Sequence, residues 1–172
     1  MAETVDQIFL RASAKKLEQL WSRIRDCLAK LSTDEIWARG HENENAIGNL
    51  VLHLNGNVRQ WIISGVGGAP DTRSRDAEFA ARGGIEIAEL RARLESTVRE
   101  AIAAMGEVTP ARMTERVMIQ KYDVTVMEAI FHVVEHFAQH TGQIIFVTKM
   151  LTGEDLGFYK HLKAAVHAEK TP

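Results

Sequence analysis

The segment between Thr125 and Gly153 constrains the fold more than any other part of the chain. Its run FHVVEHFAQHTGQIIFVTKML has apolar residues at helical spacing, and it is the most apolar stretch of the sequence. Thr125 and Glu128 have the spacing of a capping box, and Gly153 provides a stop after Thr152. The pattern predicts one long helix, beginning near Asp123 or Thr125, that runs through the centre of an all-α molecule.

Three other stretches repeat apolar residues every three or four positions. They predict helices over 5–31, 46–64 and 85–105. Asn43 or Asn45 is expected to cap the second of these helices. Long helices joined by turns favour a bundle, and a chain of 172 residues has the size of one domain, so residues 1–172 are expected to form a single domain.

The segments between these helices are predicted to be short or irregular. The stretch 32–38 can form one short turn, and 65–84 is expected to be a long loop of the kind that often borders a functional site. A second irregular segment is expected over 106–123, within which 116–119 could be extended, although nothing in the pattern requires a sheet. A short helix over 158–168 is expected to close the chain.

Composition excludes several classes of protein. The net charge of -2 provides no basic field, so nucleic acid is not expected as a partner. The longest apolar runs fall far short of the roughly 20 residues that cross a bilayer, and the N-terminus lacks the pattern of a signal peptide. The chain is therefore expected to be cytoplasmic, with no membrane partner. Cys27, the only cysteine, keeps helical register with Leu20 and Ile24 and is expected to be a small buried residue.

Histidines fall on one stripe of the last predicted helix. His132, His136 and His140 lie within about 80° of one another, because a helix advances about 100° per residue. The second predicted helix has a comparable polar stripe, made of Asn49, His53, Asn57 and Gln60. Its interior glycines, Gly48 and Gly56, cost helix stability and suggest close packing.

The spacing of His136 and His140 suits a metal ion. An HxxxH pair places two imidazoles one turn apart, and His53 from a neighbouring helix would complete a three-ligand face. Three protein ligands leave positions open for water or substrate, which is typical of a catalytic site. Imidazole binds several divalent metals, so the ligands do not name the ion. The alternative remains that these histidines are unrelated surface or core residues.

The other polar residues on the two stripes could have either of two roles. They are either solvated or fix imidazole tautomers around an ion; this set comprises Asn49, Asn57, Gln60 and Gln143. His132 is the main competitor for a place among the ligands. Glu128 and Glu135 lie about 80° to 100° from the stripe of His136, so surface or interhelical roles are favoured over a general base.

Two longer segments, NAIGNLVLHLNGNVRQWI and DVTVMEAIFHVVEHFAQHTGQIIFVTKML, resemble the DinB-like (DinB/YfiT) superfamily, particularly its branch of uncharacterised metalloproteins. The segment RDAEFAARGGI between them is similar to that branch as well. The most specific piece is HFAQHTGQI, which matches the HxxxHxGQ motif of the family. The resemblance covers most of the chain in order.

The resemblance implies a four-helix bundle of up-down-down-up type, frequently a homodimer. It places metal-binding histidines at His53, in the HL motif of the second helix, and at His136 and His140. His132 matches a variable position and is expected either to support the ligands from behind or to line the pocket. The ion expected from the resemblance is Zn2+ or Ni2+.

Activities in the superfamily include transfer of the thiols bacillithiol or mycothiol, isomerisation and hydrolysis. We therefore expect a metal-dependent enzyme that acts on a small-molecule substrate and activates either water, as a hydrolase, or a low-molecular-weight thiol, as an S-transferase. The rival expectation is a non-catalytic bundle, related to stress, that an ion braces or that binds a small ligand. Fold kinship alone does not decide between them.

Overall fold

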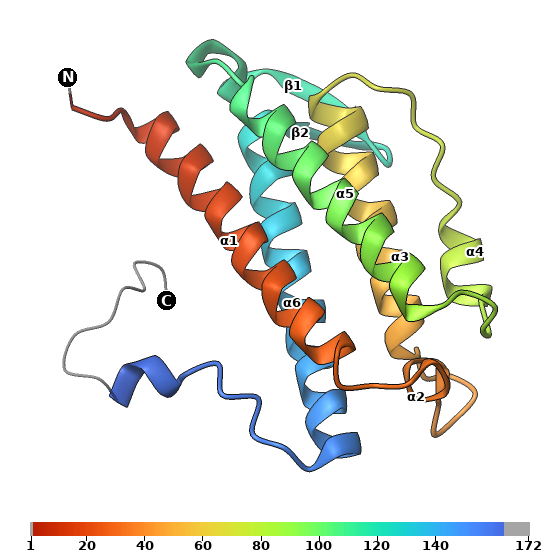
Figure 1. Ribbon diagram of the computed structural model, residues 1–172. Helices are drawn as coiled ribbons and strands as arrows, with labels where there is room; N and C mark the ends of the chain where they lie inside the picture. Colours follow the sequence, from red (N-terminus) through yellow and green to blue (C-terminus); the bar gives the residue numbers. More distant parts are fainter. Residues whose placement is uncertain (1, 164–172) are drawn as a thin grey trace.

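The computed structural model describes residues 2–163 and is mostly helical (Figure 1). Its four long helices are α1 (Val5–Leu28), α3 (Ile47–Val58), α5 (Ile87–Gly106) and α6 (Val126–Thr152). The shorter elements are α2 (Thr33–Trp37), η1 (Arg59–Val66), α4 (Arg75–Ala80), η2 (Pro110–Thr114), β1 (Arg116–Ile119), β2 (Tyr122–Thr125) and η3 (Lys160–Lys163). Within the described residues, no helix is long and apolar enough to cross a membrane.

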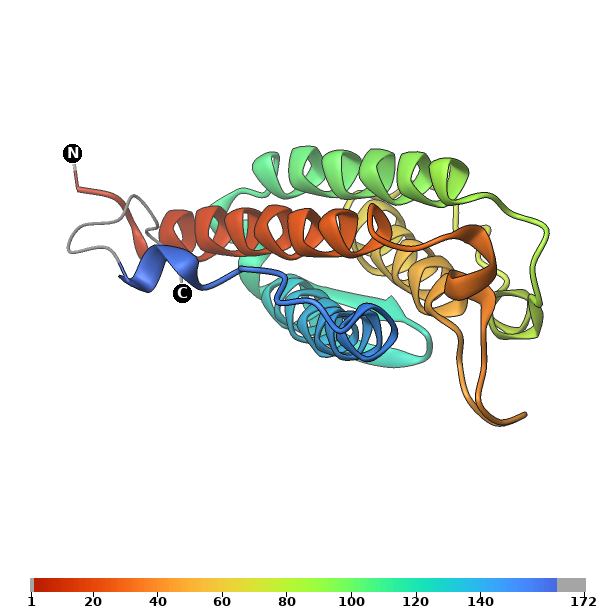
Figure 2. The same ribbon diagram turned by 60° about the horizontal axis from the view of Figure 1, so that its bottom comes forward.

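The four long helices surround one apolar core. Helix α1 packs against α5 and α6, and α3 packs against the same two helices. Figure 2 shows α1 lying between α5 and α6. Fully buried side chains from all four helices meet inside, among them Leu17, Leu54, Leu94 and Phe137. Cys27 is also buried, as predicted, and burial raises the pKa of its thiol.

Helix α6 begins and ends where the sequence predicts. The Thr125 hydroxyl accepts a hydrogen bond from the Glu128 amide, and the Glu128 carboxylate accepts one from the Thr125 amide at 2.7 Å. Gly153 adopts a left-handed conformation with φ 68° and ends the helix. Helix α2 has the matching capping box between Ser32 and Glu35. Both capping-box predictions are confirmed.

Two predictions about the flanks of α3 are wrong. The helix is capped by Ala46 and not by Asn43 or Asn45, because the Asn49 side chain turns back and accepts a hydrogen bond from the Ala46 amide at 3.1 Å. The segment 65–84 is not loop throughout, since it contains α4. Six residues are too few to show the helical periodicity on which the prediction relied.

A small antiparallel hairpin precedes α6. The prediction that 116–119 could be extended is confirmed. Strand β2 pairs with this segment, so the expectation of a molecule without a sheet was wrong. The connecting residues Gln120 and Lys121 have φ of 51° and 68°, the positive values of a tight hairpin turn. They lack the Asn or Gly that normally announces such a turn.

The predicted helices over 46–64 and 158–168 also differ in detail from the structure. Helix α3 continues directly into η1, a π-helix, so the predicted helix over 46–64 consists of an α-helical part followed by a π-helical part. The predicted closing helix over 158–168 is represented by η3 alone, and residues 164–168 lie outside the described residues.

Candidate metal centre

Three histidine side chains from α3 and α6 converge on one point. The Nε2 atom of His136 lies 3.1 Å from that of His53 and 3.1 Å from that of His140. One ligand atom from each residue can be chosen so that all lie within 4.8 Å of one another. Tetrahedral zinc with bonds of about 2.0–2.1 Å to imidazole holds its nitrogens roughly 3.3 Å apart. The two 3.1 Å spacings at His136 are therefore close to those around a shared cation.

The outer nitrogens of two rings show which atoms face inward. His53 Nδ1 lies 3.0 Å from Glu78 Oε2 and 3.1 Å from Arg73 Nη2. Because a carboxylate only accepts and Arg73 Nη2 already donates to Glu78 Oε2 at 2.8 Å, we assign the Nδ1 proton to the bond with Glu78, which leaves a lone pair on Nε2. His140 Nδ1 lies 2.6 Å from Gln143 Oε1 and donates to it in the same way. Both rings thus turn an unprotonated Nε2 toward His136.

His136 cannot satisfy these two neighbours by itself. One imidazole carries at most one proton on Nε2, which serves one of two lone pairs. Its Nδ1 atom is buried and has no hydrogen-bond partner among residues 2–163. Burial, reinforced by nearby His140 and His53, lowers the pKa of His136 to about 3, so the ring is neutral at pH 7. A cation accepts all three lone pairs at once, and the three histidines can hold a divalent metal ion.

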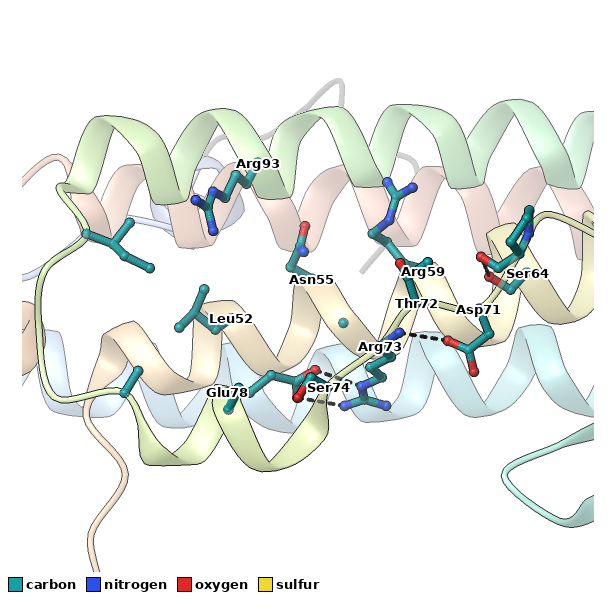
Figure 3. A pocket seen from close by; sticks show the side chains of 15 residues that line it. Leu52, Asn55, Arg59, Ser64, Asp71, Thr72, Arg73, Ser74, Glu78 and Arg93 are labelled. Carbon is teal, nitrogen blue, oxygen red and sulfur yellow. Dashed lines mark hydrogen bonds and ion pairs between the residues drawn. The ribbon is translucent and has the colours of Figure 1, made fainter.

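An ion pair that was not predicted from the sequence orients His53. Arg73 Nε lies 2.7 Å from Glu78 Oε1, and a second guanidinium nitrogen lies 2.8 Å from Oε2 (Figure 3). The two side chains are only 4% and 10% exposed. Burial by itself raises the pKa of Glu78, but Arg73 and then His53 outweigh it, and the pKa falls below its usual value. Glu78 therefore stays ionised and holds the His53 tautomer.

Gly56 makes room for this ion pair. A Cβ atom at Gly56 would lie 1.9 Å from Glu78 Oε1 and 2.9 Å from Arg73 Nε. Helix α3 therefore needs a residue without a side chain at this position, three residues after His53. At Gly48 a Cβ would meet the Trp37 ring at 2.8 Å. The prediction of close packing at both glycines is confirmed. The acidic residues at the start of α4 were the sequence feature from which the carboxylate beside Gly56 could have been predicted.

The remaining polar residues of the α3 stripe act mainly on the segment that carries Glu78. Asn49 donates to the Glu78 carbonyl at 2.8 Å and to the Ala81 carbonyl at 3.0 Å. Gln60 accepts from Arg73 at 2.9 Å and donates to Asp71 at 2.7 Å. These two contact the supports of the imidazole instead of the imidazole itself. Asn57 is buried on the same stripe.

The residues predicted on α6 take different places. Gln143 contacts His140 directly, as given above. His132 lies outside the group of three and stacks between Trp61, at 4.0 Å between ring centroids, and His136, at 5.5 Å. Glu128 is used by the helix cap and Glu135 is exposed, which agrees with the surface roles favoured for both.

Two hollows flank the histidines. A groove of about 790 Å³ between the start of α3 and the second half of α6 reaches His140 and Gln143, and its walls are mainly apolar. A second cavity, of about 360 Å³, lies between α3, α4 and α5 and is lined partly by the Arg73–Glu78 pair (Figure 3). The histidines thus have a supported side at α4 and an approachable side at the groove.

Comparison with solved structures places this fold among DinB-like proteins. A conserved protein from Enterococcus faecalis superposes with a TM-score of 0.69 and 15% identity, over 89% of this chain and 100% of that one. A DinB-like protein from Bacillus cereus gives 0.68 and 15%, over 91% and 97%. A mycothiol-dependent maleylpyruvate isomerase gives 0.63 and 15%, over 78% of this chain and 60% of the isomerase. At such identities the likeness shows the fold alone.

A comparison with curated proteins finds no match. A family model described as "protein of unknown function (DUF1572)" matches residues 4–163. This match spans all four long helices and the three histidines. The chain therefore belongs to the DUF1572 family and has a DinB/YfiT-like fold.

Proposed function

We propose that this protein is a divalent-metal-dependent enzyme that activates water or a low-molecular-weight thiol. The observation that carries the proposal is the convergence of the three Nε2 atoms beside an apolar groove. His53, His136 and His140 would hold the ion, which we expect to be Zn2+ or Ni2+, two of the metals that imidazole binds. The likeness to a mycothiol-dependent isomerase supports testing thiols as well as water.

The chain's own residues prepare the site for such chemistry. A divalent cation supplies Lewis acidity, which lowers the pKa of a water molecule or thiol bound to it. Glu78 accepts a hydrogen bond from His53 Nδ1–H and so keeps the Nε2 lone pair directed at the ion position. Arg73 neutralises Glu78, so the negative charge does not spread into the site. The groove admits a substrate at His140 and its apolar walls exclude water from the substrate's body.

The first experiment is metal analysis of untagged protein purified without chelator. About one divalent ion per chain is expected, and His136→Ala should lose it. Ester hydrolysis and the conjugation of several thiols to electrophiles are then measured on metal-loaded and chelated protein. Absence of ion from the unaltered chain would contradict the proposal.

A second measurement separates catalysis from bracing. The proposal expects a cobalt-substituted form whose spectrum changes when small anions replace solvent at an open position. A spectrum indifferent to anions, together with a large fall in melting temperature on metal removal, would instead support an ion that only braces α3 and α6.

A further inference from the structure

The groove beside His140 has two unlike parts. Its long walls are apolar and come from Leu50 on α3 and from Phe146, Val147 and Met150 on α6. Arg39, from the α2–α3 connection, also lines it. An apolar channel with a guanidinium at one side suits a ligand that is amphipathic in the same way.

The charge of Arg39 has no carboxylate partner among the described residues. Its hydrogen bonds go to neutral oxygens: the Glu44 carbonyl at 3.0 Å, the Ala81 carbonyl at 2.9 Å and the Asn49 side chain. The Glu44 carboxylate, which also lines the groove, accepts from the amides of Gly40 and His41 instead. Arg82 adds a second positive charge nearby. Arg39 and Arg82 together outweigh the single negative charge of Glu44, so an anion near Arg39 would be attracted to it.

The donors that remain on Arg39 favour a ligand with one negative charge. A guanidinium has five N–H groups. Three are used in the bonds above, and Nε is buried without a partner in the described part of the chain. One N–H on Nη1 is left for a ligand. A single donor and a single charge match a carboxylate better than a phosphate dianion, which would keep most of its charge unpaired.

Arg39 also lies close to the histidines. It bonds to Asn49, which precedes His53 by four residues, or about 6 Å along α3. His140 and Gln143 line the same groove from the other helix. A ligand head near Arg39 would thus face the candidate metal centre, while its body extends along Leu50, Val147 and Met150.

We infer that the groove binds the substrate, and that the substrate is an amphipathic carboxylate with an apolar aliphatic or aromatic body. This inference rests on the proposed function, since it names the substrate class of the same site. Arg39 is its anion-binding residue, and Val147 and its neighbours hold the body.

The test compares octanoate with 1-octanol as probes, by calorimetry, on protein from which metal has been removed. Without an ion, any preference for octanoate must come from the chain itself. A charge-assisted hydrogen bond should make octanoate bind about tenfold more tightly than octanol. Arg39→Gln should remove the preference while octanol still binds. Arg99→Gln, on the exposed face of α5, is the matched control and should change neither affinity.

A second variant keeps the test decisive if Arg39→Gln does not fold. Val147→Trp narrows the groove from α6, whereas Arg39 lies on the α2–α3 connection, and it should weaken both probes by about tenfold or more. Unaltered octanoate affinity in Val147→Trp would overturn the inference, as would equal affinity of the original protein for the two probes. A change from dimer to monomer in Val147→Trp, with no octanoate binding to the original, would assign the groove to a second copy of the chain and overturn it too.

The same measurements distinguish this inference from the proposed function. If metal analysis finds an ion but octanoate is not preferred, the substrate class is wrong and the metal centre stands. If octanoate is preferred through Arg39 but no ion binds, the groove is a carboxylate site and the metal-dependent chemistry is wrong.

Discussion

The two helices that supply the histidines hold them in different ways. On the α3 side, His53 is buried and bonded to Glu78, which a nearly buried Arg73 fixes in turn. On the α6 side, His136 and His140 are half-buried, and His140 is supported by an exposed glutamine. The difference suggests a fixed side that sets the ligand geometry and an open side where other molecules approach.

The largest effect is expected from removing a ligand on either side. His53→Ala and His140→Ala should each lower metal affinity by more than about 100-fold, because even a partner of a ligand is worth about 10- to 100-fold. His53→Ala should also destabilise the metal-free protein by about 1–3 kcal/mol, since it leaves Glu78 short of a buried partner. Metal titration and urea unfolding measure the two quantities, with the exposed His41→Ala as control. Equal stability of the two alanine variants would contradict the proposed difference between a fixed α3 side and an open α6 side.

A smaller effect is expected from removing the partners of the ligands. Glu78→Gln should weaken metal binding by about 10- to 100-fold, because the buried carboxylate sets the His53 tautomer. Gln143→Ala should weaken it only by a few-fold, roughly the value of one exposed neutral hydrogen bond. Competition with a metal indicator gives both affinities. The comparison fails if the glutamine variant of Glu78 binds as tightly as the original.

The glycines of the two helices offer a matched pair. Gly56→Ala places a methyl group 1.9 Å from Glu78 Oε1 and should destabilise the protein by about 1–3 kcal/mol. At Gly142 on α6 a Cβ meets nothing within 4 Å, so Gly142→Ala should stabilise the protein by up to about 1 kcal/mol through helix propensity. Urea unfolding of the metal-free forms measures both. A stable Gly56→Ala protein that also keeps its metal affinity would refute close contact at α4.

The smallest effect concerns acid. The pKa of Glu78 is lower in the folded chain than its ordinary value of 4.5, so its contribution to stability is full above pH 4.5 and is lost as the pH falls through the folded value. The effect is modest because burial opposes Arg73 and His53. The stability difference between the metal-free original and Glu78→Gln should shrink as the pH falls below 4.5. A difference that grows toward acid pH would reverse the sign of this argument.

Much of the fold could be predicted from local patterns. The capping box at Thr125, the stop at Gly153 and the apolar spacing of Leu54 and Phe137 each depend on residues within a few turns of one another. The helix α4 and the strand β2 were missed for the same reason: their few residues carry no period, and each is stabilised by contacts with distant segments.

The sequence by itself determined that histidines line one face of α6 and one face of α3, because helical geometry fixes which residues share a face. Only the tertiary structure decided that His53 meets His136, 83 residues away, that His132 stacks beside them instead, and that Arg73 and Glu78 stand behind His53. The physical reason is that helical periodicity fixes which side chains share a face but not which other helix that face contacts. That contact is set by the packing of the whole core.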